Sequence, residues 1–354
     1  MQQRKCQSFD FSLWLRQQGQ GRGNRWFVRL RVFLQRMFGN QLFDLRSLME
    51  NSLKIGTRGS KLALWQANWV KTAIESRQPS IPVEIVVIRT RGDKILDVPL
   101  AKVGGKGLFV KEIETALLAG RIDLAVHSMK DMPADLPQGL CIGAVPVREQ
   151  PQDVIISRGE GFETLKRGAL IGTSSLRRAA QLRHIRPDLK ILPLRGNLDT
   201  RIKKLDDGDM DAVVLAAAGV IRLGLQDRIT EYLSEAVMLP AAGQGALCIE
   251  IREGEGVIGP LMDRLNDPAT HTAVLAERSF LHRLEGSCQV PIAAHGTLEN
   301  DTLHLSGMIA DIDGSLLLRD SITGPATQPE AIGKNLAERL IDQGAADILK
   351  RLNS

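Results

Sequence analysis

The chain has 354 residues, of which 43% are hydrophobic and 25% are charged, a composition typical of globular proteins with two or three domains. It contains no run of about 18 apolar residues, which excludes a membrane-spanning helix. The formal net charge is +5, but residues 1–48 hold nine Arg or Lys against Asp10 and Asp44. The remaining chain is therefore slightly acidic and gives no reason to expect a nucleic-acid partner.

The cysteines and histidines are scattered. Cys6, Cys141, Cys248 and Cys288 form no C-x-x-C pair, and the six histidines show no paired ligand spacing. We therefore expect neither a disulfide framework nor a metal site, and a reducing compartment such as the cytoplasm fits this cysteine usage.

Residues 1–50 form an extension that we exclude from the fold. Residues 26–38 could form a basic amphipathic helix, and an Arg-rich, acid-poor stretch also suits an organelle transit peptide. Met49 begins a sequence that would be a natural start of translation. A mis-assigned start or disordered tail, a targeting segment and a membrane-surface contact all remain open interpretations.

Apolar strands and helical periodicity alternate from residue 52 onwards. In the first half of this region we predict strands at 53–57, 83–89 and 122–128, a helix after Ser60 and a helix at 111–119. In the second half we predict strands at 169–172, 190–194 and 212–216, a helix from Ser175 and a helix at 198–207. The helix after Ser60 is expected to bury Leu62, Trp65, Trp69 and Ala73. This alternation predicts an α/β fold with mostly parallel sheets.

The last part of the chain has a different pattern. A helix is predicted at 271–286, strands at 303–309 and 315–322 flank an Asp313-Gly314 hairpin signal, and a helix follows from Pro329. These elements predict a small α+β domain. Linkers are expected near 147–153, 239–245 and 266–268, where Pro and Gly interrupt the apolar pattern.

Basic residues recur where predicted strands end or the following helices begin. They are Arg58, Lys130, Arg177, Arg178, Arg195 and Arg201. Ligands of open α/β sheets bind at this edge, and arginine binds carboxylates through paired hydrogen bonds. Each of these residues alone could be a surface or ion-paired side chain, but together they indicate a small polyanionic ligand.

Three other features could carry chemistry. Asp131 follows a strand beside Lys130, so it either stays ionised among cations or caps a turn before Pro133. The glycine-rich stretch 102–109 carries Lys102 and Lys106 and is either a lid over a site or a solvated turn. Cys288 lies on a predicted loop, where a thiol is more available than in a core, although an inert structural cysteine is the more common case.

Eight of these stretches, in order, resemble the motifs of the porphobilinogen deaminase family across residues 53–352. They are Thr57-Arg-Gly-Ser-Lys-Leu-Ala, Thr90-Arg-Gly-Asp, Lys102-Val-Gly-Gly-Lys-Gly-Leu-Phe, Ala125-Val-His-Ser-Met-Lys-Asp, Gly172-Thr-Ser-Ser-Leu-Arg-Arg, Leu194-Arg-Gly-Asn, Leu239-Pro-Ala-Ala-Gly-Gln-Gly and Gly286-Ser-Cys-Gln-Val-Pro. The sequence departs from the family pattern in residues 1–48 and at Ser287, where glycine is frequent.

The resemblance implies two lobes like those of periplasmic binding proteins and a small C-terminal domain. The first lobe would comprise 51–147 plus 246–265, the second 150–241, and the cofactor-carrying domain 268–354. Cys288 would hold a dipyrromethane cofactor through a thioether, and Asp131 would be the catalytic carboxylate. Ser128, Lys130, Thr173, Ser175, Arg177 and Arg178 would bind the cofactor. Arg58, Ser60, Gln66, Arg195 and Arg201 would bind substrate, and Lys102, Lys106 and Phe109 would belong to a lid.

The implied activity is that of a transferase of tetrapyrrole biosynthesis. It would deaminate four porphobilinogen molecules and join them into hydroxymethylbilane, with Asp131 stabilising the cationic azafulvene left when ammonia departs. We expect a cytoplasmic monomer without nucleic-acid or membrane partners. The alternative from another class is a two-lobed receptor that binds small anions without chemistry, and Asp131 and Cys288 distinguish the two.

Overall fold

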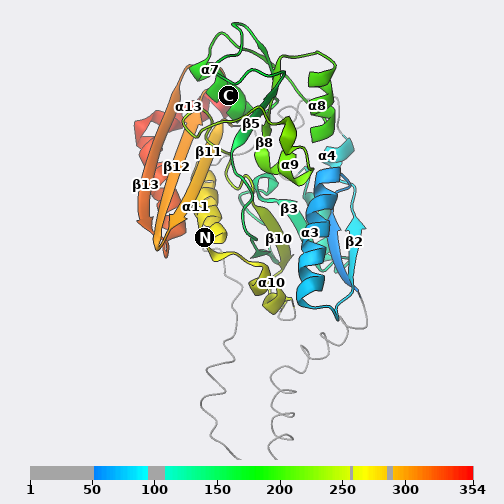
Figure 1. The fold of residues 1–354 in the computed structure, drawn as a ribbon. Coiled ribbons are helices and arrows are strands. Elements are labelled where there is room, and N and C mark those ends of the chain that lie inside the picture. The colour runs from blue at the N-terminus through cyan, green and yellow to red at the C-terminus, as the bar shows by residue number, and fades with distance from the viewer. Residues whose placement is uncertain (1–51, 95–107, 256–257, 285–289, 354) are drawn as a thin grey trace, which may run out of the picture.

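The computed structural model describes residues 52–94, 108–255, 258–284 and 290–353, arranged as two α/β lobes and a smaller C-terminal domain (Figure 1). The N-terminal extension, Lys102, Lys106 and Cys288 lie outside the described residues. Expectations that concern those residues therefore stay predictions.

The first lobe is built on a five-stranded sheet with the order β2-β1-β3-β10-β4. Its strands are β1 (Leu53–Thr57), β2 (Val83–Val87), β3 (Leu124–Ser128), β4 (Leu140–Ala144) and β10 (Leu247–Arg252). Its helices are α3 (Lys61–Arg77), α4 (Arg91–Lys94), α6 (Lys111–Leu118) and α10 (Gly259–Leu265). β1 pairs in parallel with β2 and β3, whereas β10 pairs antiparallel with β3 and β4.

The second lobe repeats this plan with the strand order β7-β6-β8-β5-β9. Its strands are β5 (Asp153–Ser157), β6 (Leu170–Gly172), β7 (Lys190–Leu192), β8 (Ala212–Ala216) and β9 (Glu231–Tyr232). Its helices are α7 (Leu176–Ile185), α8 (Leu198–Asp206), α9 (Ala217–Arg222) and the 3₁₀ turn η2 (Gln226–Arg228). β6 is parallel to β7 and β8, and β5 is antiparallel to β8 and β9.

The α/β class with mostly parallel sheets is confirmed, because in each five-stranded sheet four strands run in one direction and a single strand, β10 or β5, runs against them. The antiparallel strands β5 and β10 follow directly on the two segments by which the chain crosses between the lobes. Each of these two strands begins at the edge of its sheet where the chain arrives from the other lobe, so it runs opposite to the strands of the βα units. Neither strand was predicted, because a single apolar run without a neighbouring helical pattern gives a weak signal.

The expected buried face of α3 is wrong for its large side chains. Trp69 is 39% exposed, and Leu62 and Trp65 are only partly buried. The face that packs on the sheet consists mainly of smaller residues: Ala63, Gln66, Ala67, Val70, Ala73 and Ile74. The Trp65 ring lies 5.7 Å from the guanidinium carbon of Arg222 on α9, so this side of the helix meets the second lobe instead.

The C-terminal domain is an antiparallel meander of three strands, β11 (Ile292–Glu299), β12 (Thr302–Ala310) and β13 (Leu317–Pro325). Its helices are α11 (Pro268–Arg283), α12 (Pro329–Leu340), the π-helical η3 (Ile341–Ala345) and α13 (Ala346–Asn353). Phe280 of α11 is fully buried among the apolar residues of the sheet and α12. The predicted hairpin is confirmed, whereas β11 was not predicted.

Both crossings between the lobes are attached to the C-terminal domain through Glu277 of α11. Its fully buried carboxylate accepts hydrogen bonds of 2.6 and 3.2 Å from Arg148, which lies on the first crossing. It also accepts from the backbone N–H groups of Gly243, on the second crossing, and of Gly296, on β11. Four donors on three segments compensate the buried charge and fix the two crossings beside one another.

Candidate active site

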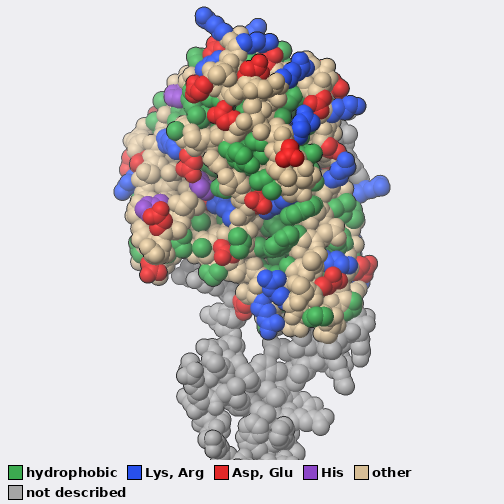
Figure 2. All heavy atoms as spheres, in the orientation of Figure 1, with side chains coloured by type: hydrophobic (Ala, Val, Ile, Leu, Met, Phe, Trp, Pro, Cys, Tyr) green, Lys and Arg blue, Asp and Glu red, His purple; other side chains and the backbone are tan. Residues whose placement is uncertain are grey.

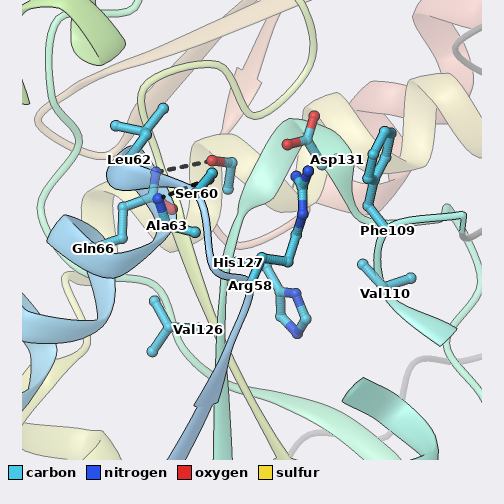
Figure 3. Close-up of a pocket in the computed structure, with 11 residues that line it drawn as sticks. Arg58, Ser60, Leu62, Ala63, Gln66, Phe109, Val110, Val126, His127 and Asp131 are labelled. Atoms are coloured by element: carbon cyan, nitrogen blue, oxygen red, sulfur yellow. Dashed lines mark hydrogen bonds between the residues drawn. The ribbon is translucent and has the colours of Figure 1, made fainter. Parts of the chain in front are cut away.

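A pocket lies at the carboxyl ends of β1 and β3, with the start of α3 on one side and Phe109 on the other (Figure 3). It contains roughly 410 Å³ of empty space, part of it open to solvent. Its lining residues are Arg58, Ser60, Leu62, Ala63, Gln66, Phe109, Val110, Val126, His127, Ser128 and Asp131. The pocket thus brings together all four residues of the first lobe that were predicted to bind substrate or to perform catalysis: Arg58, Ser60, Gln66 and Asp131.

Asp131 is presented to this pocket by a short 3₁₀ turn, η1 (Met129–Asp131), that follows β3. The turn is anchored by the buried Met129 side chain and by a hydrogen bond of 3.0 Å from the Met129 N–H to the Ala246 carbonyl. Beyond it, Arg278 of α11 donates to the carbonyls of Pro133 and Ala134. The backbone around Asp131 is therefore fixed on both sides.

The Asp131 side chain itself is exposed, and among the described residues its carboxylate forms no hydrogen bond or ion pair. A capping aspartate would accept from a nearby backbone N–H. Asp131 thus ends a 3₁₀ turn, but its carboxylate caps no backbone N–H of the described residues and is available to a ligand.

Hydrogen bonds connect α3 to the end of β3 beside the pocket. The buried Gln66 side chain donates to the Ser128 hydroxyl at 2.9 Å, and Ser60 caps α3 by accepting from the Ala63 N–H at 3.3 Å. Figure 3 shows Gln66, Ser60 and Ala63 on one wall of the pocket, facing Arg58 and Asp131. Ser60 and Ser128 therefore use part of their hydrogen-bonding capacity within the protein.

In the second lobe, Arg177 and Arg178 begin α7 and converge on a buried carboxylate. Nη1 of Arg177 lies 2.8 Å from Oδ2 of Asp153, and Nη2 of Arg178 lies 2.7 Å from Oδ1. Burial by itself raises the pKa of Asp153, but the two guanidinium charges outweigh it and lower that pKa to about 2. Ser175 caps α7 and Thr173 accepts from the Ser175 N–H, so both hydroxyls also shape the turn.

Lys130 and Arg201 place further positive charge next to this pair. Burial is the main cause that lowers the pKa of Lys130 to about 8, and the charge of Arg178 adds to it while Asp131 and Asp153 oppose it. Burial and the nearby Arg178 likewise lower the pKa of Arg201 to about 10, with Asp131 opposing and Arg195 contributing. Groups from both lobes therefore act on one another electrostatically.

We call Lys130, Arg177, Arg178, Arg195 and Arg201 the cation cluster. Within the described ranges, two carboxylates act on its members, Asp131 and Asp153. Lys130, Arg195 and Arg201 form no ion pair with any described residue. Five cations against two carboxylates leave surplus positive charge, and a ligand that brings several carboxylates would neutralise it. A carboxylate-rich cofactor fits this donor set.

Asp153, Gln244 and Asp93 contact predicted site residues but were not themselves predicted to belong to the site, although Asp93 and Gln244 lie in two of the motifs given above. Asp153 is the first residue of an otherwise apolar strand, and a charged residue in that position is unusual enough to have suggested a role for it. The buried Gln244 accepts from Lys130 at 3.3 Å and lies on the second crossing between the lobes. Asp93 pairs with Arg58 at 2.5 Å.

The face of the molecule shown in Figure 2 differs in charge from the cation cluster. On the face shown in Figure 2, basic and acidic side chains are interspersed and neither sign dominates. The positive excess of the cation cluster is not repeated on this face. No helix within the described ranges is both long enough and apolar enough to cross a membrane.

Two family models match the chain and together span most of it. The model of the porphobilinogen deaminase dipyrromethane cofactor binding domain matches residues 53–258, and that of the porphobilinogen deaminase C-terminal domain matches residues 271–342. The chain belongs to the porphobilinogen deaminase family. A porphobilinogen deaminase of Geobacter metallireducens is 56% identical over 297 residues, 84% of this chain and 93% of that one. One of Syntrophobacter fumaroxidans is 56% identical over 306 residues, 86% and 99%.

Membership of this family confirms the expectation of a transferase of tetrapyrrole biosynthesis with a dipyrromethane cofactor, and the receptor alternative is not favoured. Among solved structures, a periplasmic VFT2 domain of Bordetella pertussis BvgS is 15% identical with a TM-score of 0.38, covering 64% of this chain and 91% of that domain. The two lobes are defined by the two five-stranded sheets of the chain itself.

Proposed function

We propose that this chain joins four porphobilinogen molecules into hydroxymethylbilane, with release of ammonia, in the pocket around Asp131. The observation that carries the proposal is the position of Asp131. Its carboxylate has no protein partner in the described ranges, yet it lies within the field of Lys130 and Arg201. Such a carboxylate can accept a hydrogen bond from a pyrrole N–H or stabilise the cation left when ammonia departs.

The dipyrromethane, when bound, supplies the pyrrole to which the first substrate unit is joined. We propose that it is attached through the sulfur of Cys288. In the sequence this residue stands between Gly286 and Pro291, shortly after the last residue of α11. Helix α11 packs beside the Asp131 turn through Arg278. Lys130, Arg177 and Arg178, with the hydroxyls of Ser128, Thr173 and Ser175, would hold its carboxylates, and the surplus charge of the cation cluster supports this role.

The incoming porphobilinogen carries two carboxylates and would be held by the remaining basic and polar residues. We assign this role to Arg58, Ser60, Gln66, Arg195 and Arg201, and the role of covering the site to Lys102, Lys106 and Phe109. The side chains of Arg58, Ser60, Gln66 and Phe109 line the same pocket as Asp131, which supports the assignment.

The domain limits remain part of the proposal: 51–147 plus 246–265, 150–241 and 268–354. The membership of β10 in the first sheet and of β5 in the second supports crossings near 148 and 244. We further propose that the protein is a cytoplasmic monomer without nucleic-acid or membrane partners. The interspersed charges on the face shown in Figure 2 support the absence of a nucleic-acid partner.

Incubating the purified chain with porphobilinogen tests the proposed function. We expect four ammonia molecules for each linear tetrapyrrole released. An ammonia assay measures the first quantity, and the absorbance of the porphyrin that forms from the product measures the second. Binding of porphobilinogen without ammonia release would contradict the proposal and would favour the receptor alternative.

A further inference from the structure

Arg58 is held at the pocket wall by a residue that the proposed function does not use. Its Nε and Nη2 atoms both donate to Oδ1 of Asp93, at 3.1 and 2.5 Å. The two residues are 35 positions apart, on the β1–α3 junction and on α4, so the pair joins separate segments of the first lobe.

Asp93 is itself fixed. Its second oxygen, Oδ2, accepts from the hydroxyl of the fully buried Thr90 at 2.8 Å and from the Thr90 N–H at 3.3 Å. Burial alone would raise the pKa of Asp93, but the hydrogen bonds from Arg58 and Thr90 and the Arg58 charge hold it below its usual value. Both oxygens of an ionised carboxylate are therefore occupied, one of them entirely by Arg58.

The Phe109 ring restricts Arg58 further. The guanidinium carbon lies 4.2 Å from the centre of the ring, a cation–π contact. Gly92 permits this arrangement, because a Cβ atom there would lie 2.2 Å from the ring. Asp93 therefore binds the Nε–Nη2 edge of the Arg58 guanidinium, and Phe109 covers one face of it. The remaining nitrogen, Nη1, has no hydrogen bond to the described part of the chain.

The orientation of Arg58 matters because the residues that line this pocket include one carboxylate, that of Asp131. Figure 3 shows the Arg58 guanidinium directed toward the Asp131 side chain, yet no ion pair joins the two. A guanidinium released from Asp93 would meet Asp131 as its nearest available carboxylate in the pocket. Such a pair would occupy the oxygens that the proposed mechanism needs for the pyrrole N–H groups.

We propose that Asp93 is a positioning residue that keeps Arg58 from forming an ion pair with Asp131 and so keeps the catalytic carboxylate free, an inference that rests on the proposed roles of Arg58 and Asp131. Asp93 acts through Arg58 and does not touch the reacting atoms. In this proposal the Thr90-Arg-Gly-Asp motif serves the site by fixing Asp93, which accepts hydrogen bonds from Thr90.

A double-mutant cycle on the holoenzyme tests this inference by measuring kcat and KM for porphobilinogen. Asp93→Ala is expected to lower kcat about tenfold, whereas the same change in an Arg58→Ala background should alter kcat less than about twofold. Asp93→Asn retains an oxygen that can accept from Arg58 and should lose less than Asp93→Ala. It also provides a second measurement if Asp93→Ala folds poorly.

Asp123→Ala is the matched control. Asp123 is 24% exposed against 28% for Asp93, and it likewise combines an arginine partner, Arg252, with a backbone hydrogen bond from Lys54, away from the pocket. It should change kcat less than about twofold even if it lowers the melting temperature. An equal effect of Asp93→Ala in both backgrounds, or no effect in either, would overturn the inference. Unchanged KM and kcat in Arg58→Ala together with full turnover in Asp131→Asn would instead refute the proposed site.

Discussion

Replacing Asp131 with asparagine is expected to lower kcat for porphobilinogen by about 100- to 1,000-fold, the range seen when one group that stabilises developing charge is removed. Asparagine keeps the shape of the side chain but cannot balance the positive charge that forms when ammonia leaves. It also places a neutral amide where the cations Lys130 and Arg201 act on a carboxylate. Steady-state consumption of porphobilinogen measures the effect.

The fold should not change in this variant, because the Asp131 side chain is exposed and has no protein partner in the described ranges. Its melting temperature is expected to stay within about 2 °C of the wild-type value. Asp135→Asn is a suitable control, since Asp135 is exposed, lies four positions away and pairs with His282 outside the pocket. Near-normal turnover of Asp131→Asn would refute the assigned role.

Replacing Arg178 with alanine is expected to cost about 3 kcal/mol of unfolding free energy, near the lower end for breaking a buried ion pair. The change removes the pair with Asp153 and a hydrogen bond of 2.9 Å to the Val214 carbonyl. Arg177 still compensates Asp153, and the loss of one cation relieves repulsion within the cluster, so the cost stays below the upper end of that range. Urea denaturation at neutral pH measures it.

The control for this variant is Arg228→Ala. Arg228 also pairs with an aspartate, Asp206, but both side chains are largely exposed, and such pairs contribute about 0–1 kcal/mol. Arg178→Ala should in addition reduce the fraction of chains that carry the cofactor, since it removes a cation next to Lys130. Equal stability losses in the two variants, with full cofactor loading in both, would contradict the account of this cluster.

The sequence predicted the elements whose pattern is local. Strands such as β1, β3 and β8 are short apolar runs that lead into a helix or a turn, and Ser60 and Ser175 mark helix starts that the structure confirms. Because βα units present their loops at one edge of a sheet, the basic residues at those positions could also be placed on a common rim.

What the sequence did not reveal depends on contacts between distant segments. β5 and β10 are antiparallel because they follow the crossings, and nothing in their own residues encodes that direction. Trp65 and Trp69 were predicted to lie on the core-facing side of α3 because they are large and apolar, whereas the helix packs on the sheet mainly through smaller side chains. Asp153 and Asp93 find their arginine partners 24 to 35 positions away, which no local pattern indicates.

The central claim is that the enzyme carries its own dipyrromethane primer on Cys288, and peptide mass spectrometry of active protein tests it most directly. We predict that the peptide containing Cys288 is heavier than its sequence by two linked pyrrole units, and that a Cys288→Ser variant lacks this adduct and does not turn over. An unmodified Cys288 peptide from fully active protein, or normal turnover of Cys288→Ser, would contradict the account.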